Sequence, residues 1–222
     1  KNATSVALAC ACAGTIIGII FLTGLGLEFT NLIVSVADRY LLLALLLTMI
    51  AGIILGMGMP TAAAYIMQTA LLVPAMVKLG VKPEAAHMFV FYFAILSAIT
   101  PPVALAVYAA NGISQARIWD SSLEALKLGA AGYLIPFMFV FSPEILSIGT
   151  ADQIAITFFV SVCGIISLAA GLSGFFITKA SKLDRLILIL TSIFCLLPGG
   201  ITKIIGLLML STIMTKHFLK KP

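Results

Sequence analysis

The sequence predicts an all-α integral membrane protein whose polytopic helices include a re-entrant helical hairpin and a discontinuous helix. Hydrophobic residues make up 62% of the 222 residues and charged residues 9%, whereas a soluble domain carries about 25% charged residues. The apolar runs have the length of helices, and none shows the alternating segments of a membrane β-barrel. Two of the runs, 41–79 and 84–112, are interrupted by glycine or proline. These interruptions predict the hairpin and the discontinuous helix.

Residues 1–39 are expected to hold a scaffold span and an interfacial arm helix. The apolar run 3–22 is long enough to span a bilayer. Residues 27–39 carry polar and charged side chains at helical spacing and are too short to cross the roughly 30 Å hydrocarbon core. No methionine precedes Lys1 and no signal peptide can be delimited before the first span, so we expect the chain to be part of a longer polypeptide.

Residues 40–79 are predicted to form the hairpin. The first apolar run ends at 56–61, with the sequence Gly-Met-Gly-Met-Pro-Thr, and helical sequence then resumes. Two full spans joined by a tight turn are the alternative. A loop that reaches water normally carries charge, and residues 40–77 carry none, so a tip inside the membrane is favoured. Proline suits the start of the returning helix, where unpaired N–H groups can hold an anion or a carboxylate.

Residues 84–112 are predicted to form the broken helix. Pro101 and Pro102 remove two backbone donors and free carbonyl groups about one turn earlier. Together with the hydroxyl groups of Ser97 and Thr100, these carbonyls form an oxygen-rich patch that suits a hard monovalent cation. A plain proline kink is the alternative.

The closeness of the two breaks in the sequence indicates a shared site. In lipid, irregular backbone survives only inside protein or beside a water-filled cavity. Two such segments therefore predict one polar site at mid-membrane depth, which is typical of a secondary transporter. The main rival is a channel or receptor-like bundle with structural proline kinks.

Other classes of function lack the residues that they need. An intramembrane enzyme requires a cluster of acidic, histidine or cysteine side chains within the spans. The acidic residues stand at span ends, His87 and His217 are far apart, and the four cysteines lack metal-site spacing. We therefore expect no enzyme and no cofactor. The net charge of +5 lies in short loops and at the C-terminus, where it indicates membrane orientation and not nucleic-acid binding.

The rest of the chain is expected to be accessory. Residues 113–148 predict a second arm helix and a span, and Trp119, the only tryptophan, suits a membrane interface. Residues 149–222 predict a C-terminal membrane extension. Its basic loop 179–185 is expected to be cytoplasmic. The basic tail lies on the same side only if the chain turns back at residues 198–200.

Three stretches resemble a known family. Residues 52–65 (GIILGMGMPTAAAY), 86–93 (AHMFVFYF) and 96–104 (LSAITPPVA) are similar to the large membrane subunit of TRAP transporters. They are closest to its fused-permease branch, in which small and large membrane subunits form one polypeptide. The resemblance covers about residues 5–148, and both broken segments match in order and spacing.

This resemblance implies a function and a set of partners. TRAP systems are secondary importers, usually driven by Na⁺, that receive organic acids from a soluble periplasmic or extracytoplasmic binding protein. They act in the bacterial or archaeal cytoplasmic membrane. Their large subunit contains inverted repeats that move as an elevator, and residues 40–112 would be the transport half of the second repeat. The first repeat and the small-subunit helices would be supplied by the remainder of the fused permease.

The resemblance also implies a site. The substrate- and ion-binding residues that match its motifs lie at the hairpin tip and at the helix break: Gly56, Gly58, Met59, Pro60, Thr61, Ser97, Thr100, Pro101 and Pro102. The Na⁺ candidates among them are Gly58, Thr61, Ser97 and Thr100. The dicarboxylate branch often has an acidic residue where this chain has Met59 and Pro60. That departure leaves the substrate acid and the choice and number of coupling ions open.

Overall fold

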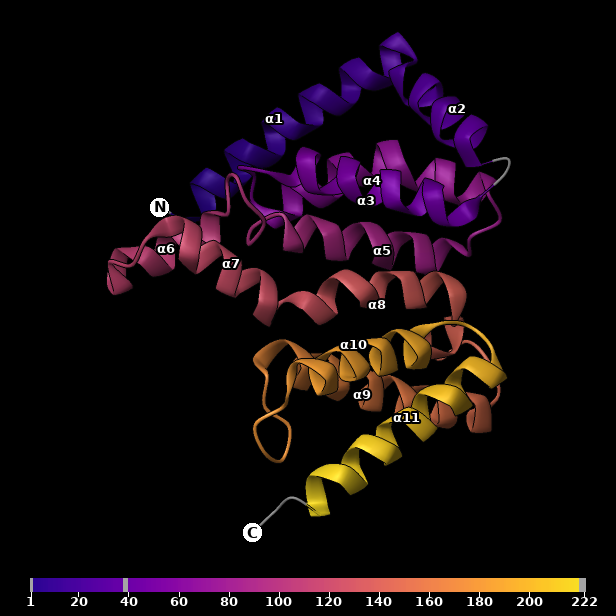
Figure 1. Cartoon of the computed structure of the whole chain (residues 1–222). Helices are drawn as coiled ribbons and strands as arrows, with labels where there is room; N and C mark the ends of the chain where they lie inside the picture. Colours follow the sequence, from indigo (N-terminus) through magenta and orange to yellow (C-terminus); the bar gives the residue numbers. More distant parts are fainter. Residues whose placement is uncertain (1, 38–39, 220–222) are drawn as a thin grey trace. The chain divides into compact units, whose positions relative to one another are not determined.

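A computed structural model describes residues 2–37 and 40–219, and every regular element in that part of the chain is helical apart from one isolated β-bridge (Figure 1). The contacts divide the chain into two compact units, residues 1–129 and 130–222. The first unit holds helices α1 to α7, and the second holds α8 to α11 with a short 3₁₀ helix. Each unit is described by itself below.

Helices α3 (Leu41–Gly56) and α4 (Thr61–Lys78) form a hairpin in the first unit. Gly58 lies in the left-handed region, with φ +78°, and allows the chain to reverse within four residues. Pro60 precedes α4 with extended backbone geometry, as expected for a residue at a helix start. The two arms measure about 24 and 27 Å at 1.5 Å per residue, so α3 is shorter than a full bilayer core.

Helix α5 (Pro83–Leu96) packs along both arms of this hairpin (Figure 1). Its first turn has the expected proline and an acidic residue, Glu84. Phe89 and Phe93 are fully buried and meet edge to face, with ring centres 4.9 Å apart. These two rings form the centre of the apolar core that holds the hairpin and α5 together.

The predicted break follows α5. Residues 97–104 are irregular, Ala104 has φ +40°, and helix α6 (Leu105–Ser114) begins after it. Helix α7 (Ile118–Leu128) then packs against α6, with Trp119 exposed at its start. The sequence placed the second arm helix at 113–127, and its helical part begins a few residues later because Gln115 ends α6 in the left-handed region.

Two helices precede the hairpin. Helix α1 (Asn2–Thr23) ends at Gly24, which has φ +70°, and helix α2 (Leu25–Ala37) follows with a bend of 71° (Figure 1). Helix α2 packs against α3 and α4. The predicted arm residues Asp38 and Arg39 lie outside the described residues.

The second unit is a bundle of helices. It contains α8 (Ala130–Phe141), the 3₁₀ helix Pro143–Leu146, α9 (Ala151–Ser173), α10 (Lys182–Leu196) and α11 (Gly200–Leu219). Cys195 on α10 is buried between Gly164 of α9 and Gly206 of α11, where a Cβ would lie 3.0 and 2.6 Å from its side chain. The two glycines therefore allow α9 and α11 to approach α10 closely.

The last helix differs from the expected short apolar piece. The sequence indicated apolar residues 201–215 followed by a basic tail, but α11 continues to Leu219 through Lys216 and His217. The chain does turn back at residues 198–200, as the orientation argument required, since Lys216 pairs with Asp184 beside the basic loop. Asp184 lies next to both basic side chains of the last turn, paired with Lys216 and 3.6 Å from His217 Nε2.

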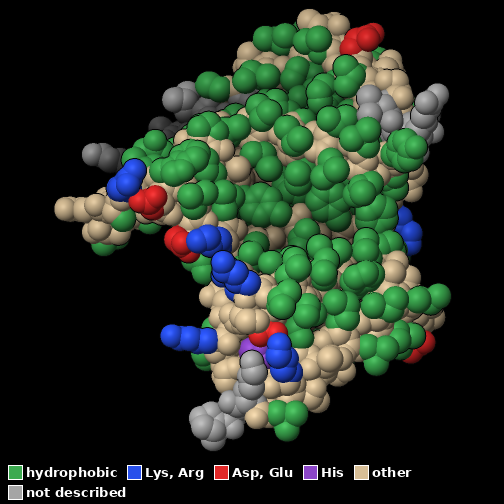
Figure 2. All heavy atoms as spheres, in the orientation of Figure 1, with side chains coloured by type: hydrophobic (Ala, Val, Ile, Leu, Met, Phe, Trp, Pro, Cys, Tyr) green, Lys and Arg blue, Asp and Glu red, His purple; other side chains and the backbone are tan. Residues whose placement is uncertain are grey.

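The surface is largely apolar. On the face in Figure 2, hydrophobic side chains form large continuous areas, and the charged groups gather in a few places between them. Large side chains such as Ile54, Phe158 and Phe159 are more than half exposed. Among the described residues, three helices (α4, α9 and α11) are long and apolar enough to cross a membrane, or up to five spans if each bent pair counts as one. The protein is therefore a multi-pass membrane protein.

Candidate functional site

The hairpin tip and the helix break meet at Gly56 and Ser97. A Cβ placed on Gly56 would lie 2.5 Å from Ser97 Oγ and 2.9 Å from Ser97 Cβ, so only glycine fits. Both residues are buried. The last turn of α3 and the end of α5 are thus in direct contact, although they are far apart in the sequence.

The rest of the tip lies beside the break. A Cβ on Gly58 would lie 4.0 Å from Val103 Cγ1, so the turn approaches the irregular segment without crowding it. Met59 and Pro60 are half-buried, and Thr61 begins α4 with its side chain half-buried. The first N–H groups of α4 have no partner within the helix, as at any helix start, and carry the positive end of its dipole.

The break presents oxygen atoms from both side chains and backbone. Ser97 Oγ donates to the carbonyl of Ala94 at 2.8 Å, and Thr100 Oγ1 donates to that of Leu96 at 2.6 Å. The Pro101–Pro102 peptide bond is cis. Ala106 N–H bonds back across the break to the carbonyl of Ala98 at 2.9 Å, so the irregular segment is a compact loop.

The structure brings only part of the predicted set together. Gly56 contacts Ser97, and Gly58 approaches the break at Val103. Gly58 and Ser97, two of the four Na⁺ candidates, therefore border the junction of tip and break.

Sequence reasoning missed Gln68. This α4 side chain is fully buried, and its Nε2 donates to the carbonyl of Gly52 on α3 at 2.8 Å. Its Oε1 is buried without a hydrogen-bond partner among the described residues. The available signal was a lone amide within an uncharged apolar run, two turns after Thr61.

A second missed pair joins the hairpin to α5. Tyr65 Oη and His87 Nδ1 are 2.9 Å apart and join α4 to α5, and Phe91 meets the Tyr65 ring edge to face. No structural role for His87 was predicted from the sequence. The structure instead places it, half-buried, in an interhelical hydrogen bond.

The chemistry available at the tip and break is that of neutral oxygen and nitrogen atoms. No group of three or more acidic, histidine or cysteine side chains occurs among the described residues, so they offer no site for a transition metal. Hydroxyl and carbonyl oxygens suit a hard cation, and the α4 amide groups suit an anion. Residues 40–77 contain no charged side chain that could bind a cation or an anion.

Comparison with known protein families matches residues 1–154 to the DctM component of tripartite ATP-independent periplasmic (TRAP) transporters. The matched region includes the whole hairpin and the whole break. The chain belongs to this family. It is therefore a TRAP-type transporter permease, and such permeases work in general with a periplasmic binding protein and a small membrane subunit. No curated protein and no solved structure matched the chain.

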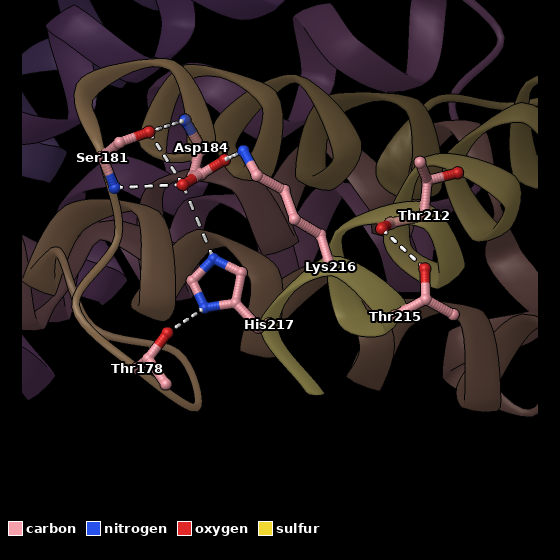
Figure 3. Close-up of polar contacts among 7 residues, drawn as sticks. All are labelled: Thr178, Ser181, Asp184, Thr212, Thr215, Lys216 and His217. Carbon is pink, nitrogen blue, oxygen red and sulfur yellow. Dashed lines mark hydrogen bonds and ion pairs between the residues drawn. The ribbon is translucent and has the colours of Figure 1, made fainter. Parts of the chain in front are cut away.

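A separate polar cluster lies beyond the DctM match. In the second unit, Asp184 in the first turn of α10 accepts hydrogen bonds from the Ser181 backbone and hydroxyl groups at 3.1 and 2.7 Å (Figure 3). Lys216 Nζ lies 2.5 Å from its other oxygen. His217 Nε2 is 3.6 Å from Asp184 Oδ2, and its Nδ1 is 2.8 Å from Thr178 Oγ1. This Asp184 cluster ties the end of α11 to the start of α10.

Proposed function

We propose that this DctM chain supplies one half of the transport site of a Na⁺-coupled, binding-protein-dependent importer of organic acids. The tip 56–61 and the break 97–102 would form that half. The observation that carries the proposal is the contact between Gly56 and Ser97. It sets two segments of irregular backbone side by side, and such backbone is tolerated in a membrane only where it is enclosed by protein or lines a cavity.

The oxygen atoms at the tip and the break are suited to bind the coupling ion. A dehydrated Na⁺ needs several oxygen ligands, and this half offers the hydroxyls of Thr61, Ser97 and Thr100 together with backbone carbonyls near Gly58. These groups would make one Na⁺ site and half of the substrate site. The other half of the substrate site would come from the first repeat, because one repeat cannot enclose a substrate.

The acid substrate would bind to hydrogen-bond donors at the tip. The N–H groups at the start of α4 and its dipole favour a carboxylate. Since residues 40–77 contain no basic side chain, the positive charge that balances the acid would be the bound Na⁺ itself. Ion and substrate would then stabilise each other's binding, which is the thermodynamic basis of coupled uptake.

The other partners follow from the TRAP resemblance. A periplasmic or extracytoplasmic binding protein would deliver the acid, and the first repeat and small-subunit helices of a fused permease would complete the site. The cytoplasmic membrane of a bacterium or archaeon is the matching location. The hairpin and α5 share one apolar core around Phe89 and Phe93, and such a core would let them move together as an elevator.

The test uses the complete permease with its binding protein, reconstituted in proteoliposomes. Thr100→Ala removes a hydroxyl at the break, and Thr48→Ala is a matched control. Both hydroxyls donate to the carbonyl four residues earlier, at 2.6 and 2.8 Å, but Thr48 lies in the interior of α3. We expect Thr100→Ala alone to raise the Na⁺ concentration needed for half-maximal uptake. Uptake that does not depend on a Na⁺ gradient, or equal effects of the two substitutions, would refute the proposal.

A further inference from the structure

The best-buried polar group of the hairpin is the amide of Gln68, which the proposed site does not yet use. It lies on α4 and reaches across to α3, where its Nε2 donates to the Gly52 carbonyl at 2.8 Å. We infer that Gln68 is a positioning residue for the site, because its amide clamps the two arms of the hairpin just below the tip and holds Gly56 against Ser97. The inference rests on the proposed function.

The first argument is the shape of the junction. Gly52 and Gly56 are one turn apart on α3 and both face the Gln68 side chain. A Cβ on Gly52 would lie 3.3 Å from Gln68 Oε1, and a Cβ on Gly56 would lie 2.9 Å from its Nε2. The amide thus occupies the strip of α3 that the two glycines leave bare, and a larger residue at either position would displace it.

The second argument is that α5 meets the same strip. The Cβ positions of Gly52 and Gly56 lie 3.3 Å from Phe93 Cβ and 2.5 Å from Ser97 Oγ, respectively. The amide of Gln68 and the hydroxyl of Ser97 therefore approach Gly56 from two different helices. A change in the spacing of α3 and α4 at this level changes where Ser97 lies relative to the tip.

The third argument concerns the orientation of the Gln68 amide and the free-energy cost of burying it. Only the orientation with Nε2 toward Gly52 gives a hydrogen bond, since the reverse would set two carbonyl oxygens against each other. In this orientation Oε1 is buried without a partner among the described residues, which is unfavourable in an apolar surrounding. A methionine of similar length would fill the space without that cost. Packing alone therefore does not account for an amide here.

These observations lead to a specific role. A cation held by backbone carbonyls and hydroxyls is sensitive to small changes in their spacing, since its ligands must be held close to their binding geometry. The Gln68 Nε2 group is engaged by the Gly52 carbonyl. It fixes the separation between the tip carbonyls and Ser97, and so affects the affinity for the coupling ion more than the maximal rate.

The experiment compares Gln68→Met with Thr69→Val in the complete reconstituted permease. Gln68→Met keeps the length of the side chain and removes the clamp. Thr69→Val is the control, because the neighbouring Thr69 hydroxyl bonds only within α4, to the Tyr65 carbonyl at 2.7 Å. We expect Gln68→Met to raise the half-saturating Na⁺ concentration about fivefold, with little change in maximal uptake per folded transporter. Thr69→Val should leave both values unchanged.

A second variant and a second readout keep the test decisive. Gln68→Asn stays polar but is one methylene too short to reach Gly52, and it replaces Gln68→Met if that variant does not fold. Amide hydrogen exchange at residues 52–60 should rise in the Gln68 variants and not in Thr69→Val. The inference that Gln68 clamps the hairpin would be wrong if the Gln68 variants had the half-saturating Na⁺ concentration of the wild type. It would also be wrong if their amide hydrogen exchange at residues 52–60 were unchanged. Uptake by the wild type without any Na⁺ dependence would overturn the proposed function alone, and the clamp would then be judged by the exchange data.

Discussion

Ser97 Oγ lies 2.5 Å from the point where a Cβ of residue 56 would stand, so glycine at position 56 is a condition for closing the hairpin tip onto the helix break. The two segments come from different parts of the sequence, and each is irregular for its own local reason. Gly58 allows the reversal at the tip, and the two prolines stand in the irregular segment 97–104 that follows α5. The contact between them brings the two breaks side by side.

Gly56→Ala should therefore impair the site. The added methyl would overlap both Oγ and Cβ of Ser97, the latter at 2.9 Å, and neither atom lies at the end of a long flexible side chain. We expect uptake to fall at least about tenfold, which corresponds to 1.4 kcal/mol or more of lost affinity or transition-state stabilisation. Gly112→Ala is the control, because a Cβ there meets nothing within 4 Å.

A compensating substitution makes this prediction sharper. Ser97→Gly removes the two Ser97 atoms that the Gly56→Ala methyl would overlap and leaves the 2.9 Å approach to Gln68 Nε2, so the double variant should recover part of the folded protein lost in Gly56→Ala. It should not recover Na⁺ affinity, because the Ser97 hydroxyl is also gone. A double variant that remains as poorly folded as Gly56→Ala would show that the steric explanation is wrong.

Substitution of Gly58 is predicted to destabilise the tip through backbone strain and not through steric overlap. Its φ is +78°, while a Cβ there would lie a comfortable 4.0 Å from Val103. Alanine in the left-handed region costs about 1–2 kcal/mol, and asparagine costs less because it tolerates that region. Gly58→Asn should thus retain a higher melting temperature than Gly58→Ala in detergent. Equal melting temperatures would contradict the backbone explanation.

Much of the fold could be predicted from the sequence because each feature has a local cause. The turn of the hairpin contains glycines and a proline, and α5 begins at Pro83 with Glu84 in its first turn. Residues 97–104, which contain two prolines, are irregular. The family match covers residues 1–154, which include these same stretches. Local sequence determines such turns and helix starts without help from distant residues.

The parts that could not be predicted depend on contacts between helices. Nothing next to Gln68 in the sequence shows that Gly52 on another helix will accept its hydrogen bond. Asp184 was read as part of a basic loop, yet Lys216, thirty-two positions later, makes it a buried partner. Such pairings can be predicted only when it is known which helix faces meet. The sequence of an apolar helix with polar residues at its end does not show which helix it packs against.

The close contact of α10 with α11 gives a prediction for the second unit. A Cβ on Gly206 would lie 2.6 Å from Cys195 Sγ and 2.9 Å from its backbone nitrogen, which cannot move aside like a side chain. Gly206→Ala should destabilise this unit by about 1–3 kcal/mol through overpacking. Gly200→Ala, where a Cβ meets nothing within 4 Å, is the control. Faster amide exchange in α10 and α11 of Gly206→Ala alone is the expected result, and equal exchange would contradict it.

Asp184 makes the stability of the second unit depend on pH. The Lys216 ammonium, and after it the Ser181 hydroxyl, hold the pKa of the Asp184 carboxyl far below its usual value of about 3.9. A carboxylate with a depressed pKa in the folded state stabilises it above the unfolded pKa, and that contribution is lost as the pH falls through the folded pKa. The stabilisation should thus be complete at neutral pH and decline below about pH 4.

Asp184→Asn tests this expectation, with Glu124→Gln as the control for an exposed ion pair. Glu124 and Lys127 side chains are 66% and 53% exposed, so their pair contributes little, whereas Asp184 is buried. We expect Asp184→Asn to cost about 2 kcal/mol at pH 7, typical of lost hydrogen bonds to a charged group, and Glu124→Gln to cost almost nothing. The difference between wild type and Asp184→Asn should narrow as the pH is lowered below about 4. A difference that stays constant from pH 7 to pH 3 would show that the lost packing, and not the carboxylate charge, is responsible.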